Sequence, residues 1–224
     1  DLPLAIKTAV TARTINNGQS CIAAKRFIVH ADIYDAFVNG FVAGLAALKL
    51  GDPMQASTDI GPLATPAIRE EVHGLVQDAV TRGAKVLLGG QIPDGVGNYY
   101  PATALSEITP EMQVYGEEVF GPVALIFKVA NIGESVQLAN ATRFGLASSV
   151  WTTDAGEQAR FVRDIEAGSV FINAMVASDP RLPFGGVKAS GFGRELSRHG
   201  LHEFVNTKAV SIGAAPDAHR SKTE

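Results

Sequence analysis

The sequence has little cysteine: Cys21 is the only one among 224 residues. A single cysteine excludes an internal disulfide and fits a reducing compartment, so we expect a cytoplasmic location. No apolar run approaches the length of a membrane span, and the first residues do not resemble a signal peptide. These absences predict a protein with no membrane partner.

An excess of basic charge is also missing. The chain carries 19 Lys and Arg against 23 Asp and Glu, a formal charge of −4, and it has no long basic run. This balance predicts no nucleic-acid partner. Hydrophobic residues make up 46% of the chain, which is ample for a core, and the length suggests one domain or one domain with an appendage.

The first residues resemble the first turn of a helix, with Asp1 as its cap and Pro3 near its first position. The chain does not begin with Met. A chain that begins inside an element is expected to be a piece of a longer one.

Helix-like and strand-like segments alternate along the chain, which predicts an α/β domain with an open, mostly parallel, twisted sheet flanked by helices. The apolar run 123–129 is typical of a central parallel strand. Asp32 and Thr65 are the expected caps of two helices. The expected helices cover 2–13, 32–48, 65–82, 134–141 and 155–166. The expected strands or extended segments cover 26–30, 85–88, 99–105, 123–129, 148–151 and 169–173. A long loop is expected over 174–193.

The loop that holds Cys21 is the first candidate for chemistry. A thiolate is the strongest nucleophile among ordinary side chains. Gly18 permits a tight backbone turn, and a helix-like start after Cys21 would favour the thiolate through the helix N-terminus. The alternative is a buried structural cysteine, since cysteine is among the most often buried residue types.

Three ordered motifs resemble those of the aldehyde dehydrogenase superfamily, and the closest branch looks like the succinate-semialdehyde dehydrogenases. The resemblance extends from residue 1 to about residue 213. The motifs are NNGQSCIAAKR (16–26), EEVFGPV (117–123) and LPFGGVK (182–188), the last followed by SGFGRE (190–195).

The resemblance implies NAD(P)-dependent oxidation of an aldehyde to a carboxylate. Cys21 would attack the aldehyde and form a thiohemiacetal, NAD or NADP would accept a hydride, and water would hydrolyse the resulting thioester. By motif, Glu118 matches the residue that holds the nicotinamide ribose, and Phe120 matches the aromatic beside the nicotinamide. Without the motif, the two would be a solvated acid and a core phenylalanine.

The implied substrate is succinate semialdehyde. Phe184 belongs to the loop that lines the substrate tunnel in the family, and Ser178 resembles a serine that contacts the substrate tail. Arg181 is a further candidate for the distal carboxylate, because a buried carboxylate needs a partner, although a surface or interface ion pair is its alternative. Another branch has arginine where this chain has Ile15, so Ile15 and Phe184 also permit a neutral aldehyde.

Arg13 is not expected to replace that missing arginine, because two helical positions rotate a side chain by about 200°. His199 and His202 have a spacing that can chelate zinc, but the segment resembles a helix surface with no third ligand, so no metal is expected.

The resemblance also predicts the division of the chain. Residues 1–203 would form the catalytic domain, 204–213 an edge strand that pairs with a neighbouring subunit in a homo-oligomer, and 214–224 a disordered tail. The general base and the domain that binds the rest of the cofactor are expected ahead of Asp1. We therefore expect this part alone not to catalyse aldehyde oxidation. The alternative from a different class is a non-catalytic interaction module that retains the fold.

Overall fold

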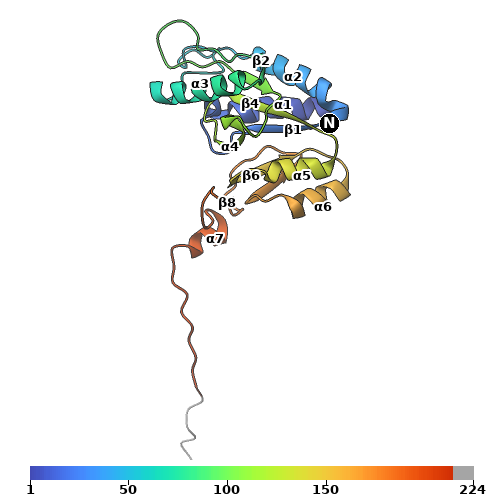
Figure 1. Ribbon diagram of the computed structural model, residues 1–224. Helices are drawn as coiled ribbons and strands as arrows, with labels where there is room; N and C mark the ends of the chain where they lie inside the picture. Colours follow the sequence, from blue (N-terminus) through green and yellow to red (C-terminus); the bar gives the residue numbers. More distant parts are fainter. Residues whose placement is uncertain (214–224) are drawn as a thin grey trace, which may run out of the picture.

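The structure, a computed structural model, describes residues 1–213 (Figure 1). One part is built around a four-stranded sheet, and a second part contains two short two-stranded sheets. In Figure 1 the first part lies above the second, and the chain then leaves the second part through a short helix, α7.

The four-stranded sheet has the order β1-β4-β3-β2. Strand β4 runs parallel to both of its neighbours, while β2 is antiparallel to β3. The prediction of a central parallel strand over 123–129 is therefore confirmed. The strands are β1 (Arg26–His30), β2 (Lys85–Leu88), β3 (Thr103–Ser106) and β4 (Val123–Val129).

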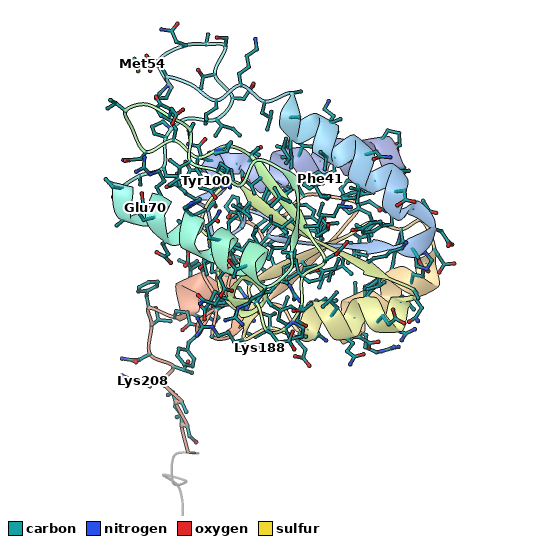
Figure 2. All side chains as sticks on the ribbon, turned by 45° about the horizontal axis from the view of Figure 1, so that its top comes forward. Phe41, Met54, Glu70, Tyr100, Lys188 and Lys208 are labelled. Atoms are coloured by element: carbon teal, nitrogen blue, oxygen red, sulfur yellow. The ribbon has the colours of Figure 1, made fainter. Side chains whose placement is uncertain are left out.

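Alternate residues of β4 face two separate apolar clusters, one on each side of the sheet. Leu125 and Phe127 join the cluster under helix α3, and Ile126 joins the cluster under helix α2. Because side chains alternate along a strand, a nearly continuous apolar run buries both faces. Tyr100 belongs to the first cluster and Phe41 to the second, and both are fully buried (Figure 2).

The helices of this part are α1 (Leu2–Thr14), α2 (Tyr34–Ala46), α3 (Pro66–Thr81) and α4 (Gln113–Gly116). The predicted caps of α1 and α3 are confirmed, since the side chains of Asp1 and Thr65 accept hydrogen bonds from backbone N–H groups of the first turns. The predicted cap of α2 is wrong. Asp32 lies in a 3₁₀ turn (Ala31–Ile33), and α2 begins only after it.

The second part contains α5 (Ile132–Asn140), α6 (Ala155–Asp164) and α7 (Ser197–His202). Strands β6 (Ala147–Val150) and β7 (Ser169–Ile172) form a parallel pair, and β5 (Phe144–Gly145) pairs antiparallel with β8 (Val187–Lys188). The α/β class is confirmed. Two details are corrected: the sheet is not continuous, because β6 and β7 pair only with each other within residues 1–213, and β8 interrupts the predicted loop 174–193.

The segment 204–213 follows α7 and contains no strand, so the edge strand expected there is not formed in this single chain. Its residues are exposed, and the segment extends away from the rest of the molecule (Figure 1; Lys208 is labelled in Figure 2). A strand needs a hydrogen-bonding neighbour, and within residues 1–213 nothing pairs with this segment. The predicted tail, 214–224, lies outside the described residues.

Candidate active site

Cys21 lies in a short turn between α1 and β1, and it is exposed. The turn is closed by a 3.0 Å hydrogen bond from the backbone N–H of Ala23 to the carbonyl of Ser20. The buried structural cysteine is thereby excluded. The helix-like start predicted after Cys21 is wrong, because the next regular element is β1, so no helix N-terminus acts on the thiol.

The backbone just before this turn is left-handed at three successive residues. The φ angles are 49° at Asn16, 55° at Asn17 and 74° at Gly18. Asn tolerates this region through its short polar side chain, and Gly has no Cβ to clash. At Gly18 the space is also missing, since an added Cβ would lie 2.2 Å from the carbonyl oxygen of Gly121. The Cys21 loop therefore touches, backbone to backbone, the loop that carries Glu118.

Arg13 joins the Cys21 loop to the start of β4 from inside the protein. Its side chain is fully buried and donates to the carbonyl of Gly18 at 3.0 Å and to that of Val123 at 3.2 Å. Burial lowers the pKa of Arg13, and the nearby charge of Glu118 opposes that shift. The position agrees with the prediction that Arg13 does not replace an arginine at Ile15, because its guanidinium points into the core.

Glu118 pairs with Lys25, whose Nζ lies 3.1 Å from Oε1 of Glu118. The neighbouring Glu117 pairs instead with Arg143, so the two carboxylates have different partners and do not form an acid–base pair. Phe120 is half-buried in the loop that leads into β4. Lys25 itself follows Cys21 by four residues, so Glu118 is linked to the turn of Cys21 through one side chain.

A cavity of about 210 Å³ opens beside Cys21. Phe184 and Glu195 both contribute to its wall. Reciprocal backbone hydrogen bonds between Phe184 and Glu195 hold this wall in place. The remaining lining residues are Leu146, Gly185, Gly186, Ser190, Phe192 and Gly193.

The other predicted substrate residues do not line this cavity. Ile15 is half-buried and Ser178 is exposed. The Arg181 side chain is 86% exposed and forms an ion pair with Asp179, with Nη2 2.6 Å from Oδ2. That guanidinium lowers the pKa of Asp179 to about 2. The substrate roles of Ile15, Ser178 and Arg181 stay predictions.

Two residues near the site had no role in the sequence analysis. Lys25 lies within the cysteine motif, but motif matching assigns it nothing. Arg13 was considered only as a substrate contact. The signal that could have found both is a cation four residues after, and another eight residues before, the cysteine. Their partners, Glu118 and Val123, are distant in sequence.

Two kinds of feature are absent from the part of the chain that the structure describes. None of its helices is both long and apolar enough to cross a bilayer. It also contains no group of three His, Cys, Asp or Glu side chains placed to hold a metal ion. His199 and His202 lie exposed on α7.

The structure thus places an exposed cysteine in a tight turn within an α/β domain, in backbone contact with the loop of Glu118. The family model described as "Aldehyde dehydrogenase family" matches residues 1–210, and the chain belongs to this family. Succinate-semialdehyde dehydrogenase [NADP(+)] 1 of Mycobacterium tuberculosis is 59% identical over 212 residues, 95% of this chain and 46% of that protein. Succinate-semialdehyde dehydrogenase [NADP(+)] of Mycobacterium avium is 58% identical over 215 residues, 96% of this chain and 46% of that protein.

Solved structures give the same family. Succinic semialdehyde dehydrogenase from Streptococcus pyogenes, in complex with NADP+, superposes with a TM-score of 0.91 at 34% identity, covering 95% of this chain and 47% of that one. Succinate-semialdehyde dehydrogenase from Burkholderia pseudomallei has a TM-score of 0.87 at 38% identity, covering 91% and 42%. The chain thus spans about half the length of the curated relatives it matches.

Proposed function

We propose that this chain is the catalytic part of an NAD(P)-dependent aldehyde dehydrogenase that oxidises succinate semialdehyde to succinate. The observation that carries the proposal is the exposed Cys21 at the edge of a cavity that Phe184 helps to line. The names of the mycobacterial relatives support the substrate and favour NADP.

The chain's own residues account for the covalent half of the reaction. The Cys21 thiolate attacks the aldehyde carbon, and the carbonyl oxygen becomes the alkoxide of a thiohemiacetal. The backbone N–H of Cys21 is the candidate donor to that alkoxide. After oxidation a thioester joins the acyl group to Cys21, and water releases the carboxylate and restores the thiol. The base that activates Cys21 and this water is expected in the part of the protein ahead of Asp1.

The nicotinamide nucleotide, when bound, accepts the hydride from the thiohemiacetal carbon. The residues present fit its riboside. The Glu118 side chain is 40% exposed, and Lys25 contacts its Oε1, which leaves carboxylate lone pairs available for ribose hydroxyls. Phe120, two residues further along, would pack beside the nicotinamide ring.

We further propose that the full-length protein is a cytoplasmic homo-oligomer in which 204–213 pairs with a neighbouring subunit. The support is the exposure of apolar side chains in this segment. Phe204 and Ile212 are both 91% exposed, which is unfavourable unless another surface covers them.

The test is a steady-state assay of the full-length protein with succinate semialdehyde, or a neutral aliphatic aldehyde of similar length, and NAD or NADP. We expect the acidic aldehyde with NADP to give the highest kcat/KM. Cys21→Ala should reduce it on the order of 10³-fold or more, because removing a nucleophile leaves only binding contributions.

Cys21→Ser is the matched control for packing, since it keeps the size of the side chain but not the thiolate. It should also be inactive while binding NADP normally. Turnover by Cys21→Ala would contradict the proposed mechanism. A preference of the wild type for the neutral aldehyde would contradict the proposed substrate. A wild-type protein without activity on any aldehyde would favour the non-catalytic module.

A further inference from the structure

Lys25 connects the turn that carries Cys21 with the loop that carries Glu118. Its ammonium lies 3.1 Å from Oε1 of Glu118 and donates at 3.2 Å to the carbonyl of Ala23, the last residue of the turn. Only 18% of its side chain is exposed. A lysine held by both a carboxylate and a carbonyl has a fixed position, unlike most surface lysines.

The titratable and charged groups that face Lys25 come from three elements. Arg13 reaches it from α1, Cys21 from its own turn and Glu118 from the loop before β4. Burial lowers the pKa of Lys25 and Arg13 lowers it further, whereas Glu118 and Cys21 raise it. The ammonium is thus partly desolvated and depends on Glu118 for its compensation.

Glu118 depends on Lys25 in turn. Within residues 1–213, Lys25 is the only side chain that forms an ion pair or hydrogen bond with the Glu118 carboxylate. The carboxylate of Glu118 would otherwise sample several rotamers at a half-exposed position. One carboxylate oxygen is therefore fixed, and the orientation of the other follows.

We propose that Lys25 is a positioning residue: it holds the Glu118 carboxylate against the nucleophile turn, so that the nicotinamide riboside binds in register with Cys21. This inference rests on the proposed function, in which Glu118 contacts the ribose. Lys25 touches neither substrate nor cofactor and acts through Glu118. Its contribution therefore falls on nicotinamide-nucleotide binding and hydride transfer and not on the reactivity of the aldehyde.

The test measures the Kd for NADP and steady-state kinetics in the full-length protein for Lys25→Met, Glu118→Gln and the double variant. Lys25→Met should raise Kd and KM for NADP about tenfold, the loss expected for one charge-assisted contact, and leave KM for the aldehyde within about twofold. Because Lys25 acts through Glu118, the double variant should bind NADP no more weakly than Glu118→Gln alone.

Two controls separate positioning from a general structural effect. Lys188→Met removes another lysine that pairs with a glutamate, Glu166, and donates to a backbone carbonyl, and it should leave NADP binding unchanged. Lys25→Arg keeps a cation next to Glu118 and should bring the Kd back to within about threefold of the wild type.

Unchanged NADP binding in Lys25→Met, or additive effects in the double variant, would overturn this inference while the wild type still oxidised aldehydes. A wild-type protein that bound no nicotinamide nucleotide would overturn the inference together with the proposed function. The wild type shows aldehyde oxidation that Cys21→Ala abolishes in the first case but not in the second, so this assay distinguishes the two failures.

Discussion

The two loops on either side of the cavity are held in opposite ways. The Cys21 loop is fixed by groups inside the protein: the buried guanidinium of Arg13, the backbone contact at Gly18 and the hydrogen bonds of Asn17 to Gly61 and Pro62. In the segment 174–196, backbone hydrogen bonds between Phe184 and Glu195 hold the wall, but the charged and aromatic side chains make their contacts at the surface. The ion pair of Arg181 with Asp179 is exposed, and so is the side chain of Phe192.

Under the proposed function, this difference separates chemistry from recognition. A nucleophile must be held within a fraction of an ångström of its productive position, and buried contacts achieve this. A substrate wall can change with little effect on the fold when its contacts are solvent-exposed. Substitutions that damage the Cys21 loop should therefore lower the stability of the protein, whereas substitutions of the exposed side chains of Arg181 and Phe192 should not.

Gly18→Ala should have the largest effect. The new Cβ would lie 2.2 Å from the Gly121 oxygen, and the φ of 74° disfavours any side chain. Overpacking and left-handed strain together predict a loss of about 3 kcal/mol in the free energy of unfolding. Urea denaturation of the full-length protein measures this.

Gly74→Ala is the matched control, because Gly74 lies within α3 and an added Cβ would meet nothing within 4 Å. It should stabilise the protein by about 0.5–1 kcal/mol, the advantage of Ala over Gly inside a helix. Equal stability of the two variants would mean that the Cys21 and Glu118 loops are not in backbone contact.

Arg13→Met should have a smaller effect of the same sign. It leaves the carbonyls of Gly18 and Val123 without their donor, but it also removes a buried charge. The two effects oppose each other, and the net expected loss in the free energy of unfolding is about 2 kcal/mol. Thermal and urea unfolding of the full-length protein check it.

Arg82→Met serves as the control for Arg13→Met. Arg82 forms an ion pair with Asp78 one helical turn away and is half-exposed. Such a pair contributes little, so this variant should unfold like the wild type. If Arg13→Met and Arg82→Met had the same free energy of unfolding, the buried contacts of Arg13 would not stabilise the protein.

The elements that the sequence predicted well depend on local chemistry. Thr65 followed by Pro66 sets a helix start through the hydroxyl cap and the fixed φ of proline, whatever the rest of the fold. The apolar run of β4 requires burial on both faces, which only a central strand provides. The cysteine motif predicted the loop of Cys21, whose glycine and asparagines suit the left-handed backbone.

The features that the sequence did not predict depend on contacts between distant residues. Arg13 and Val123 are 110 positions apart, and no spacing rule links them. Lys25 and Glu118 meet for the same reason, through the parallel pairing of β1 with β4. The edge strand expected over 204–213 from the family resemblance stays a prediction, because a single chain offers it no hydrogen-bonding neighbour.

Arg181→Ala should have the smallest effect, and it tests the role of the exposed side chains in 174–196. Arg181 is exposed and already paired with Asp179, so KM should change equally little for succinate semialdehyde and for a neutral aldehyde of similar length. A selective rise in KM for the acidic aldehyde would instead assign Arg181 to the substrate carboxylate.

The same variant changes a measurable titration. Since the guanidinium holds the pKa of Asp179 at about 2, below the ordinary Asp value, the pair contributes stability at neutral pH and loses it as the pH falls toward 2. In Arg181→Ala the Asp179 pKa should rise toward the ordinary value of about 3.9. NMR titration of the carboxyl group measures this shift. An unchanged value would mean that the two side chains do not pair in solution, and Arg181 would then be free to meet a substrate carboxylate.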